Sequence, residues 1–330
     1  MSQVPIFTIC RKAFPGANRA LINLSQTTQL TRHMALASTN PNSPEIQFLV
    51  LHLAETRPQH VLFGGWDPAY DIIIRALRGK SIRFGVYWTS SGGQTDMSQE
   101  MSKLSAILRH EAIDAYLFCS EGVARGLQTA VSNTHYLPLT IADLPPETPT
   151  NSAHAPFAIS LFCPPPEYKR KNIFNCLLAL ARLRGDYRLI LNGLSTDPAY
   201  RHLLENLKIP FVDHGWMTRA DYEAQLGQLD LGLQLSFAES FNYVAAEHLV
   251  RGVPVLASNM VPVVQQLSPQ IQQQLTVAHA DDATAVLNHL QPLIDNPVHT
   301  ARLGQQARAE LLVSNQQQIK AATAVLQSLL

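Results

Sequence analysis

Two glutamates lie near the start of a predicted helix: Glu239 in the short loop just before it, and Glu247 on the helix itself. The loop follows the apolar run Leu229–Leu235, the helix is expected to begin near Asn242, and Gly252 ends it before a second apolar run. Open backbone amides and the positive dipole at a helix N-terminus can hold a phosphate. Carboxylates beside them can accept hydrogen bonds from the hydroxyls of a sugar ring and a ribose. The pattern therefore indicates a ligand that carries phosphate and hydroxyl groups, although two glutamates at this spacing are also common by chance.

The elements that must position these residues alternate regularly, because short apolar runs are separated by longer helical segments along the whole chain. Such alternation is typical of parallel strands joined by right-handed helical crossovers. In the first half the predicted strands are Ile6–Cys10, His60–Gly64, Arg83–Trp88, Ala115–Cys119 and His135–Pro138. The predicted helices between them are Ala17–Leu30, Pro44–Glu55, Pro68–Gly79, Met97–Arg109 and Glu121–Val131.

A proline-rich stretch, residues 142–156, interrupts this alternation. Its four prolines and small polar residues can continue neither a helix nor a strand, so it is the predicted linker between two domains, 1–150 and 151–330. The strands predicted after it are Phe157–Phe162, Tyr187–Asn192, Pro210–Asp213, Leu229–Leu235, Val253–Ala257 and Leu275–Ala278. The helices predicted after it are Asn172–Arg184, Pro198–Leu207, Arg219–Leu226, Asn242–Arg251, Ala283–Ile294, Pro297–Leu312 and Gln316–Leu329.

The predicted fold class is therefore α/β, with two Rossmann-like doubly wound domains facing across a cleft. Ligands of such sheets bind beyond the carboxyl ends of the strands, and a cleft between two domains is a common place for a substrate.

Composition excludes several other classes of protein. Lys plus Arg and Asp plus Glu are both 25, so bulk charge favours neither nucleic acid nor an anionic membrane as a partner. Every apolar run is too short to span a bilayer, and the N-terminus lacks the pattern of a secretory signal. The four cysteines and twelve histidines show no metal-ligand spacing, so we expect no metal, no cofactor and a cytoplasmic location. The glycine motifs of dehydrogenases and of phosphate-loop kinases are also missing.

The segment around the two glutamates resembles the signature of retaining GT-B glycosyltransferases, especially those of family 4. That signature is an acid, a short Gly/Phe loop, a helix with a second acid, and then Gly-Val-Pro-Val, which here is Gly252–Val255. The resemblance implies that Glu239 binds hydroxyls of the donor sugar and that Glu247 binds the ribose. It also implies that the loop amides at Phe241, Asn242 and Tyr243 hold the distal phosphate or the sugar.

A basic turn before the helix predicted at Asn172 extends the resemblance. Family members carry a lysine at this place, which Lys171 matches, and an arginine five residues earlier, where this chain has Pro166. The resemblance implies that Lys171 neutralises the diphosphate leaving group, with Arg170 or Lys169 substituting for the arginine. The alternative is a solvated basic turn without a ligand.

Two further segments resemble parts of the family's site. Residues 212–217 resemble the loop that contacts the nucleotide base, which implicates Trp216 and Met217 in donor binding. In the first half, Gly16 and Arg19 stand where relatives have a glycine-rich loop that approaches the donor phosphate and the acceptor, although Gly16 also fits a simple turn before a helix. Residues 86–93 lack the histidine that many relatives place near the sugar, so Ser90 or its neighbour Thr89 would make that contact.

The resemblance therefore implies a retaining hexosyltransferase with Glu239 and Lys171 as its catalytic residues and no metal. The donor would be a nucleotide-sugar, with a UDP-hexose the commonest in the family, and the acceptor would be a glycan, a lipid-linked group or a protein. The resemblance implies that the last helix packs back on the first domain. Two alternatives stay open: a non-catalytic GT-B-like subunit that binds a nucleotide-sugar or a partner enzyme, and a nucleotide-sugar 2-epimerase.

Overall fold

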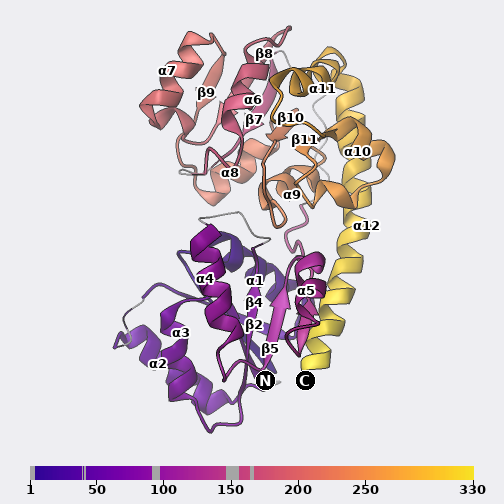
Figure 1. Ribbon diagram of the computed structural model, residues 1–330. Coiled ribbons are helices and arrows are strands. Elements are labelled where there is room, and N and C mark those ends of the chain that lie inside the picture. Colours follow the sequence, from indigo (N-terminus) through magenta and orange to yellow (C-terminus); the bar gives the residue numbers. More distant parts are fainter. Residues whose placement is uncertain (1–3, 39, 41, 91–96, 146–155, 164–166) are drawn as a thin grey trace. The chain divides into compact units, whose positions relative to one another are not determined.

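The apolar runs of the sequence form the strands of two separate parallel sheets. A computed structural model describes residues 4–38, 40, 42–90, 97–145, 156–163 and 167–330. Within these residues the chain forms two α/β units, each with a six-stranded sheet (Figure 1). The first unit comprises Met1–Asp143 and Asn315–Leu330, and the second comprises Leu144–Ser314. Most of the predicted linker, and Pro166, lie outside the described residues.

The sheet of the first unit has the strand order β2-β1-β3-β4-β5-β6, with every neighbouring pair parallel. Its strands are β1 (Ile6–Arg11), β2 (Thr31–Leu36), β3 (His60–Gly64), β4 (Arg83–Trp88), β5 (Ala115–Phe118) and β6 (Thr134–Tyr136). The helices between them are α1 (Pro15–Thr28), α2 (Pro44–Thr56), α3 (Pro68–Ala76), α4 (Met97–Leu108) and α5 (Glu121–Leu127). This is the flavodoxin-like order 2-1-3-4-5 with one strand added.

Both faces of this sheet are buried, because successive side chains of a strand point to opposite sides. Phe63 and Val86 lie in a cluster of buried residues that α2, α3, α4 and α5 also supply. On the other face, a Cβ added at Gly64 would touch Leu21 of α1. On that face too, the Nε2–H of His60 donates to the carbonyl of Leu329, 2.6 Å away. Helices therefore cover the first unit's sheet on both sides.

The end of the chain is a single helix, α12 (Pro297–Leu329), of 33 residues. The prediction of two helices, separated after Leu312, was wrong. Ser314 and Asn315 are weak helix formers, but contacts outside the helix hold them in place. Ser314 Oγ donates to Gln266 Oε1 at 2.9 Å, and the buried Asn315 amide makes two 2.9 Å hydrogen bonds with the backbone N–H and C=O of Ile141.

Asn315 should contribute more to stability than its place on a helix surface indicates. Asn315→Ala leaves two buried backbone groups of Ile141 without their partner, and the expected cost is about 2 kcal/mol of unfolding free energy. Urea denaturation measures this loss, and Gln316→Ala at the exposed neighbouring position is the control, with an expected change below about 0.5 kcal/mol. Equal stability of both variants would show that the Asn315 hydrogen bonds add nothing.

The sheet of the second unit has the order β12-β11-β10-β7-β8-β9, again with parallel neighbours. Its strands are β7 (Phe157–Leu161), β8 (Tyr187–Leu191), β9 (Phe211–Asp213), β10 (Leu231–Gln234), β11 (Val255–Ser258) and β12 (Thr276–Val277). Its helices are α6 (Ile173–Leu180), α7 (Pro198–Asn206), α8 (Arg219–Leu226), α9 (Tyr243–Leu249), α10 (Pro269–Leu275) and α11 (Ala283–Asp295), with 3-10 turns η1 (Leu194–Thr196) and η2 (Val264–Gln266).

Numbered within the unit, these strands run 3-2-1-4-5-6, the order of dinucleotide-binding sheets. All six strands predicted in this half are present. Strand β2 and helix α10 were not predicted. Strand β2 is an edge strand with polar and partly exposed positions, and α10 is a seven-residue helix in a glutamine cluster with only two apolar side chains, Ile271 and Leu275. No helix in the described part of the chain, α12 included, is both long and apolar enough to cross a membrane.

Candidate active site

The strand order of the second unit reverses between β7 and β10, which lie side by side although they are far apart in sequence. At such a switch point the loops after the two strands diverge and leave a crevice beyond the strands' carboxyl ends. Gln234, the last residue of β10, spans this point, because its Nε2 donates to the carbonyl of Phe162 just after β7 at 3.1 Å. The Oε1 atom of Gln234 accepts hydrogen bonds from Lys171 and Asn242.

Three predicted site residues meet beside Gln234. The Nζ of Lys171 lies 2.6 Å from Oε1 of Glu239 and 3.4 Å from Oε1 of Gln234. An Nη1 atom of Arg170 lies 2.9 Å from the same Glu239 oxygen. The side chains of Lys171 and Glu239 are each only 7% exposed, and that of Arg170 is 14% exposed. Arg170 and Lys171 of the basic turn are therefore not solvated surface residues. Lys171 forms an ion pair with Glu239, which lies 68 residues further along the chain.

Asn242 joins this cluster from the start of helix α9. Its backbone is in the left-handed region, with φ 74°, which asparagine tolerates better than most residues. From there its Nδ2 donates to Gln234 at 3.0 Å and to Glu239 at 3.3 Å, while its Oδ1 accepts from the backbone N–H of Ala245. Asn242 therefore caps α9 and ties the helix to the switch point. Its neighbours Phe241 and Tyr243 pack their rings together, 5.0 Å between centroids.

The charges of the cluster balance. Burial alone would raise the pKa of Glu239, but Lys171 and Arg170 outweigh it and hold that pKa below its usual value. Arg170 also forms an ion pair with Glu167, so two carboxylates face two cations. Glu239 is consequently ionised at neutral pH, and it occupies the basic groups predicted to hold a diphosphate.

Glu247 is buried on α9 and has two partners that the sequence did not indicate. Arg219 Nη1 donates to its Oε1 at 2.6 Å, and the Tyr222 hydroxyl donates to its Oε2 at 2.8 Å. Both partners lie on α8, three residues apart and thus on one face of the helix. Burial, followed by the charge of Glu247, raises the pKa of Tyr222 well above its usual value, so its hydroxyl keeps its proton. Arg219 and Tyr222 fix the orientation of this carboxylate.

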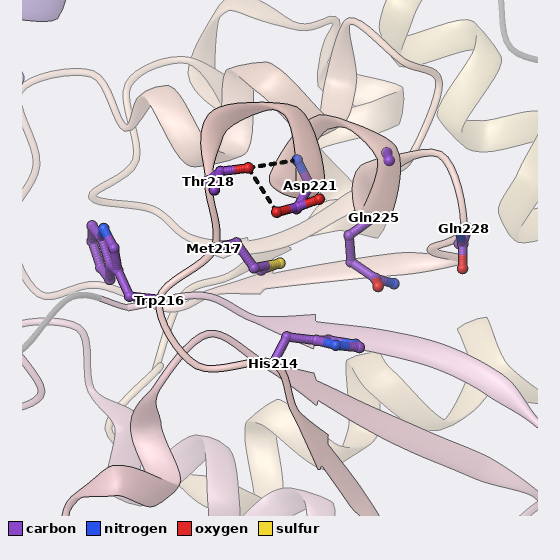
Figure 2. A pocket seen from close by; sticks show the side chains of 8 residues that line it. His214, Trp216, Met217, Thr218, Asp221, Gln225 and Gln228 are labelled. Atoms are coloured by element: carbon purple, nitrogen blue, oxygen red, sulfur yellow. Dashed lines mark hydrogen bonds between the residues drawn. The ribbon is translucent and has the colours of Figure 1, made fainter.

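Helix α8 and the loop before it line a pocket of about 420 Å³. Figure 2 shows Met217, Gln225 and His214 directed into a common space, while the Trp216 ring turns outward; Trp216 is 73% exposed. The side chains that line the pocket belong to His214, Trp216, Met217, Thr218, Asp221, Ala224, Gln225 and Gln228. The structure thus places Trp216 and Met217 at a pocket whose lining does not include Glu247.

Asp213 stabilises the loop that contains Trp216 and Met217. Its carboxylate accepts hydrogen bonds from the backbone N–H groups of Gly193 at 2.6 Å, Ser195 at 2.7 Å and Gly215 at 2.9 Å. Although burial raises its pKa, these amides lower it below its usual value overall. Asp213 therefore fastens the loops after β8 and β9 to each other. Its place as the last residue of a strand before a glycine turn was the available signal in the sequence, and the same end-of-strand position marks Gln234.

The candidates in the first unit have partners of their own. Gly16 lies in the first turn of α1, and a Cβ there would meet no atom within 4 Å. Arg19 forms an ion pair with Asp143 at 2.8 Å, and Ser90 Oγ donates to Glu100 Oε1 at 2.8 Å. The predicted glycine-rich loop is therefore the beginning of a helix, and the hydrogen bond of Ser90 joins the segment just after β4 to α4.

Metal ligands and reactive thiols do not gather in the part of the chain that the structure describes. No group of three or more His, Cys, Asp or Glu side chains comes together there. The four cysteines are free and buried, and burial raises the pKa of each thiol to about 12; they are Cys10, Cys119, Cys163 and Cys176. Thiols of this kind stay protonated and behave as packing residues.

Comparison with known proteins gives a match in structure but not in sequence. No protein-family model and no curated protein match the chain. Sucrose-phosphate synthase from Thermosynechococcus elongatus matches with a TM-score of 0.71 and 15% identity over 98% of each chain. A glycosyltransferase from Rickettsia africae matches with a TM-score of 0.71 and 14% identity over 100% of this chain and 99% of that one. HepE from Anabaena, solved with UDP and glucose, matches with a TM-score of 0.70 and 13% identity over 97% and 99%.

At such low identity the likeness establishes the fold. The chain has the two-domain GT-B architecture, and the α/β fold class predicted from the sequence is confirmed. The match extends over nearly the full length of both chains, so it includes both sheets.

Proposed function

We propose that this protein is a glycosyltransferase that binds a nucleotide-sugar donor at the carboxyl edge of the second unit's sheet. One observation carries the proposal: Lys171, Arg170 and Glu239 meet at the switch point of a sheet with the strand order of dinucleotide-binding folds. A lysine and an arginine can neutralise a departing diphosphate, and a carboxylate can accept hydrogen bonds from sugar hydroxyls. The GT-B fold of the chain supports the same reaction class.

The other candidates take supporting roles in this proposal. Glu247, oriented by Arg219 and Tyr222, binds the ribose hydroxyls. The loop at Trp216 and Met217 contacts the base, and Phe241, Asn242 and Tyr243 lie closest to the distal phosphate or the sugar. In the first unit, Gly16, Arg19 and Ser90 are proposed to contact the acceptor or a phosphate.

The proposed donor is a UDP-hexose, transferred with retention. Its support is the resemblance of the segment from Glu239 to Val255 to retaining enzymes, together with the structural neighbour HepE, which was solved with UDP-glucose. The proposal names no acceptor.

A thermal-shift series with UDP, GDP, ADP and dTDP tests the function directly. A diphosphate present at one hundred times its dissociation constant should stabilise the protein by about 2.7 kcal/mol. One base should be preferred, and the matching nucleotide-hexose should release nucleoside diphosphate when incubated with the protein. Glu239→Gln should lower that release at least tenfold, since it removes the charged hydrogen-bond acceptor for the sugar. The control is Glu205→Gln at an exposed position of α7, which should leave the release unchanged. No stabilisation by any of the four diphosphates would refute the proposal.

Activity should persist in EDTA. In this proposal the positive charge opposite the leaving diphosphate comes from Lys171 and Arg170, so no cation is needed in the step. The measurement is release of nucleoside diphosphate with and without an excess of chelator. Loss of release with chelator, and its return with magnesium or manganese, would contradict a metal-free step.

A further inference from the structure

The groups proposed to hold the donor diphosphate are already occupied by a carboxylate of the protein itself. Glu239 Oε1 lies 2.6 Å from Lys171 Nζ and 2.9 Å from Arg170 Nη1, so one oxygen atom receives both cations. The side chains of Lys171 and Glu239 are each 7% exposed, which leaves little room for a second anion beside the first. An ion pair this short and this buried is not a surface contact that solvent weakens.

A diphosphate cannot simply be added to this arrangement. Its negative oxygens would lie next to the ionised Glu239, and like charges at short distance in a buried site repel strongly. Glu167 and Glu239 already balance Arg170 and Lys171, so the cluster has no unmatched positive charge to offer. Phosphate binding therefore requires one of the carboxylates to leave its cations.

We propose that Glu239 is an internal anion that closes the diphosphate site and that donor binding exchanges this carboxylate for the phosphate oxygens. The inference rests on the proposed function and concerns how the same site is regulated. The exchange breaks the Glu239 contacts to Lys171 and Arg170 and forms phosphate contacts to the same two cations. No covalent bond changes.

Neutral side chains keep the cluster in place while the exchange occurs. Gln234 Oε1 accepts from Lys171 and from Asn242, and Gln234 is itself anchored to the carbonyl of Phe162. Asn242 is held by its cap to Ala245. When the phosphate is bound to Lys171, Gln234 still orients the lysine. The displaced Glu239 carboxylate then becomes available for sugar hydroxyls. Phosphate binding thus precedes and permits the sugar contact.

The test compares the affinities of inorganic pyrophosphate and UDP for wild type, Glu239→Gln and Glu167→Gln by isothermal titration calorimetry. Glu239→Gln should bind both ligands at least tenfold more tightly than wild type does, because the competing anion is gone. Glu167→Gln removes the same charge from the same cluster but leaves the Lys171–Glu239 pair intact, so its gain should stay below threefold.

Each outcome has a definite reading. Equal affinity of wild type and Glu239→Gln for UDP overturns the exchange but leaves the proposed function standing, since the nucleotide still binds. An equal gain in both variants also overturns it, because the gain would then come from the overall charge. If none of the three proteins binds any nucleoside diphosphate, the proposed function fails and the exchange fails with it.

A structure of the wild-type protein with pyrophosphate or UDP provides a second test that does not depend on a variant folding. The Lys171 Nζ to Glu239 Oε1 distance, 2.6 Å in this structure, should exceed 4 Å in the complex, the outer limit for an ion pair. A ligand seated on Lys171 while the 2.6 Å contact persists would overturn the exchange. Addition of a free hexose should give a sugar contact to Glu239 only when the diphosphate is also present.

Discussion

Lys171→Met is expected to lower the free energy of unfolding by about 3 kcal/mol, because it leaves the Glu239 carboxylate buried with one of its two cations missing. Removal of one partner of a buried pair costs about 3 to 5 kcal/mol, and the lower end applies since Arg170 remains 2.9 Å from the same oxygen. Urea denaturation at neutral pH measures the loss. Lys169→Met, at the exposed position two residues earlier in the same basic turn, is the control and should change stability by less than about 0.5 kcal/mol.

The double variant Lys171→Met/Glu239→Gln separates the pair from its surroundings. It removes both buried charges, so it should recover at least half of the loss, and the two single changes should not be additive. In binding experiments Lys171→Met should lower the affinity for UDP far more than the affinity for uridine, because the lysine is proposed to contact only the phosphates. Equal stability of the Lys171 and Lys169 variants would show that the buried pair contributes nothing.

The second unit should lose stability as the pH falls below about 6.5, because it contains a buried neutral histidine, His248. His248 is fully buried on α9, and its burial lowers its pKa to about 4. Its Nδ1–H donates to the carbonyl of Val244 at 2.7 Å, so Nε2 accepts from the Ser160 hydroxyl at 2.6 Å. The neutral ring is therefore built into the contact between α9 and β7. Only glycine fits opposite it, because a Cβ at Gly232 would lie 2.8 Å from the ring.

The sign of the effect follows from proton binding. In the unfolded chain a histidine titrates near pH 6.5, whereas in the folded chain His248 stays neutral down to about pH 4. The unfolded state thus binds more protons between these values, and stability falls as the pH falls below 6.5, by up to about 1.4 kcal/mol per pH unit and about 3 kcal/mol in all. Below about pH 4 this contribution no longer changes.

Urea midpoints at pH 7 and pH 5 measure this dependence. Wild type should lose about 2 kcal/mol between them, and His248→Gln should lose markedly less. His33, in the first unit, also has its pKa lowered to about 4 by burial, and it is less enclosed. His33→Gln is therefore the matched control, and it should leave the acid response of the second unit unchanged. The same slope in wild type and His248→Gln would exclude His248 as the cause.

Strands were the most predictable part of this fold, because a strand buried on both faces is a continuous apolar run. Strands β3 and β7 are buried throughout and β8 is buried at every position but Arg188, and the sequence located all three within one residue. Strand β2 pairs only with β1 and mixes polar with apolar positions, so its sequence does not separate it from a loop. The continuous helix α12 was also missed, since the Asn315 contact that sustains it joins residues 174 positions apart.

The sequence identified residues of the candidate site, but it did not show which of them contact each other. Glu239, Lys171 and Glu247 were marked by motif, yet no local pattern shows that Lys171 pairs with Glu239 or that Glu247 pairs with Arg219 and Tyr222. Such pairings depend on which loops the strand order brings together. The sequence also could not show that Glu239 and Lys171, assigned to different parts of one ligand, form an ion pair with each other.

Helix α12 also constrains the order in which the chain can fold during synthesis. The first unit is completed by Asn315–Leu330, which leave the ribosome only after all of Leu144–Ser314. At about 5 to 20 residues per second, the first unit's sheet waits roughly 10 to 40 s for the helix end that meets His60. During that time the second unit can fold alone, and one sheet face of the first unit stays incompletely covered. A chaperone that shields apolar surface should therefore bind nascent chains that end shortly before residue 315 more strongly than chains that include the whole helix.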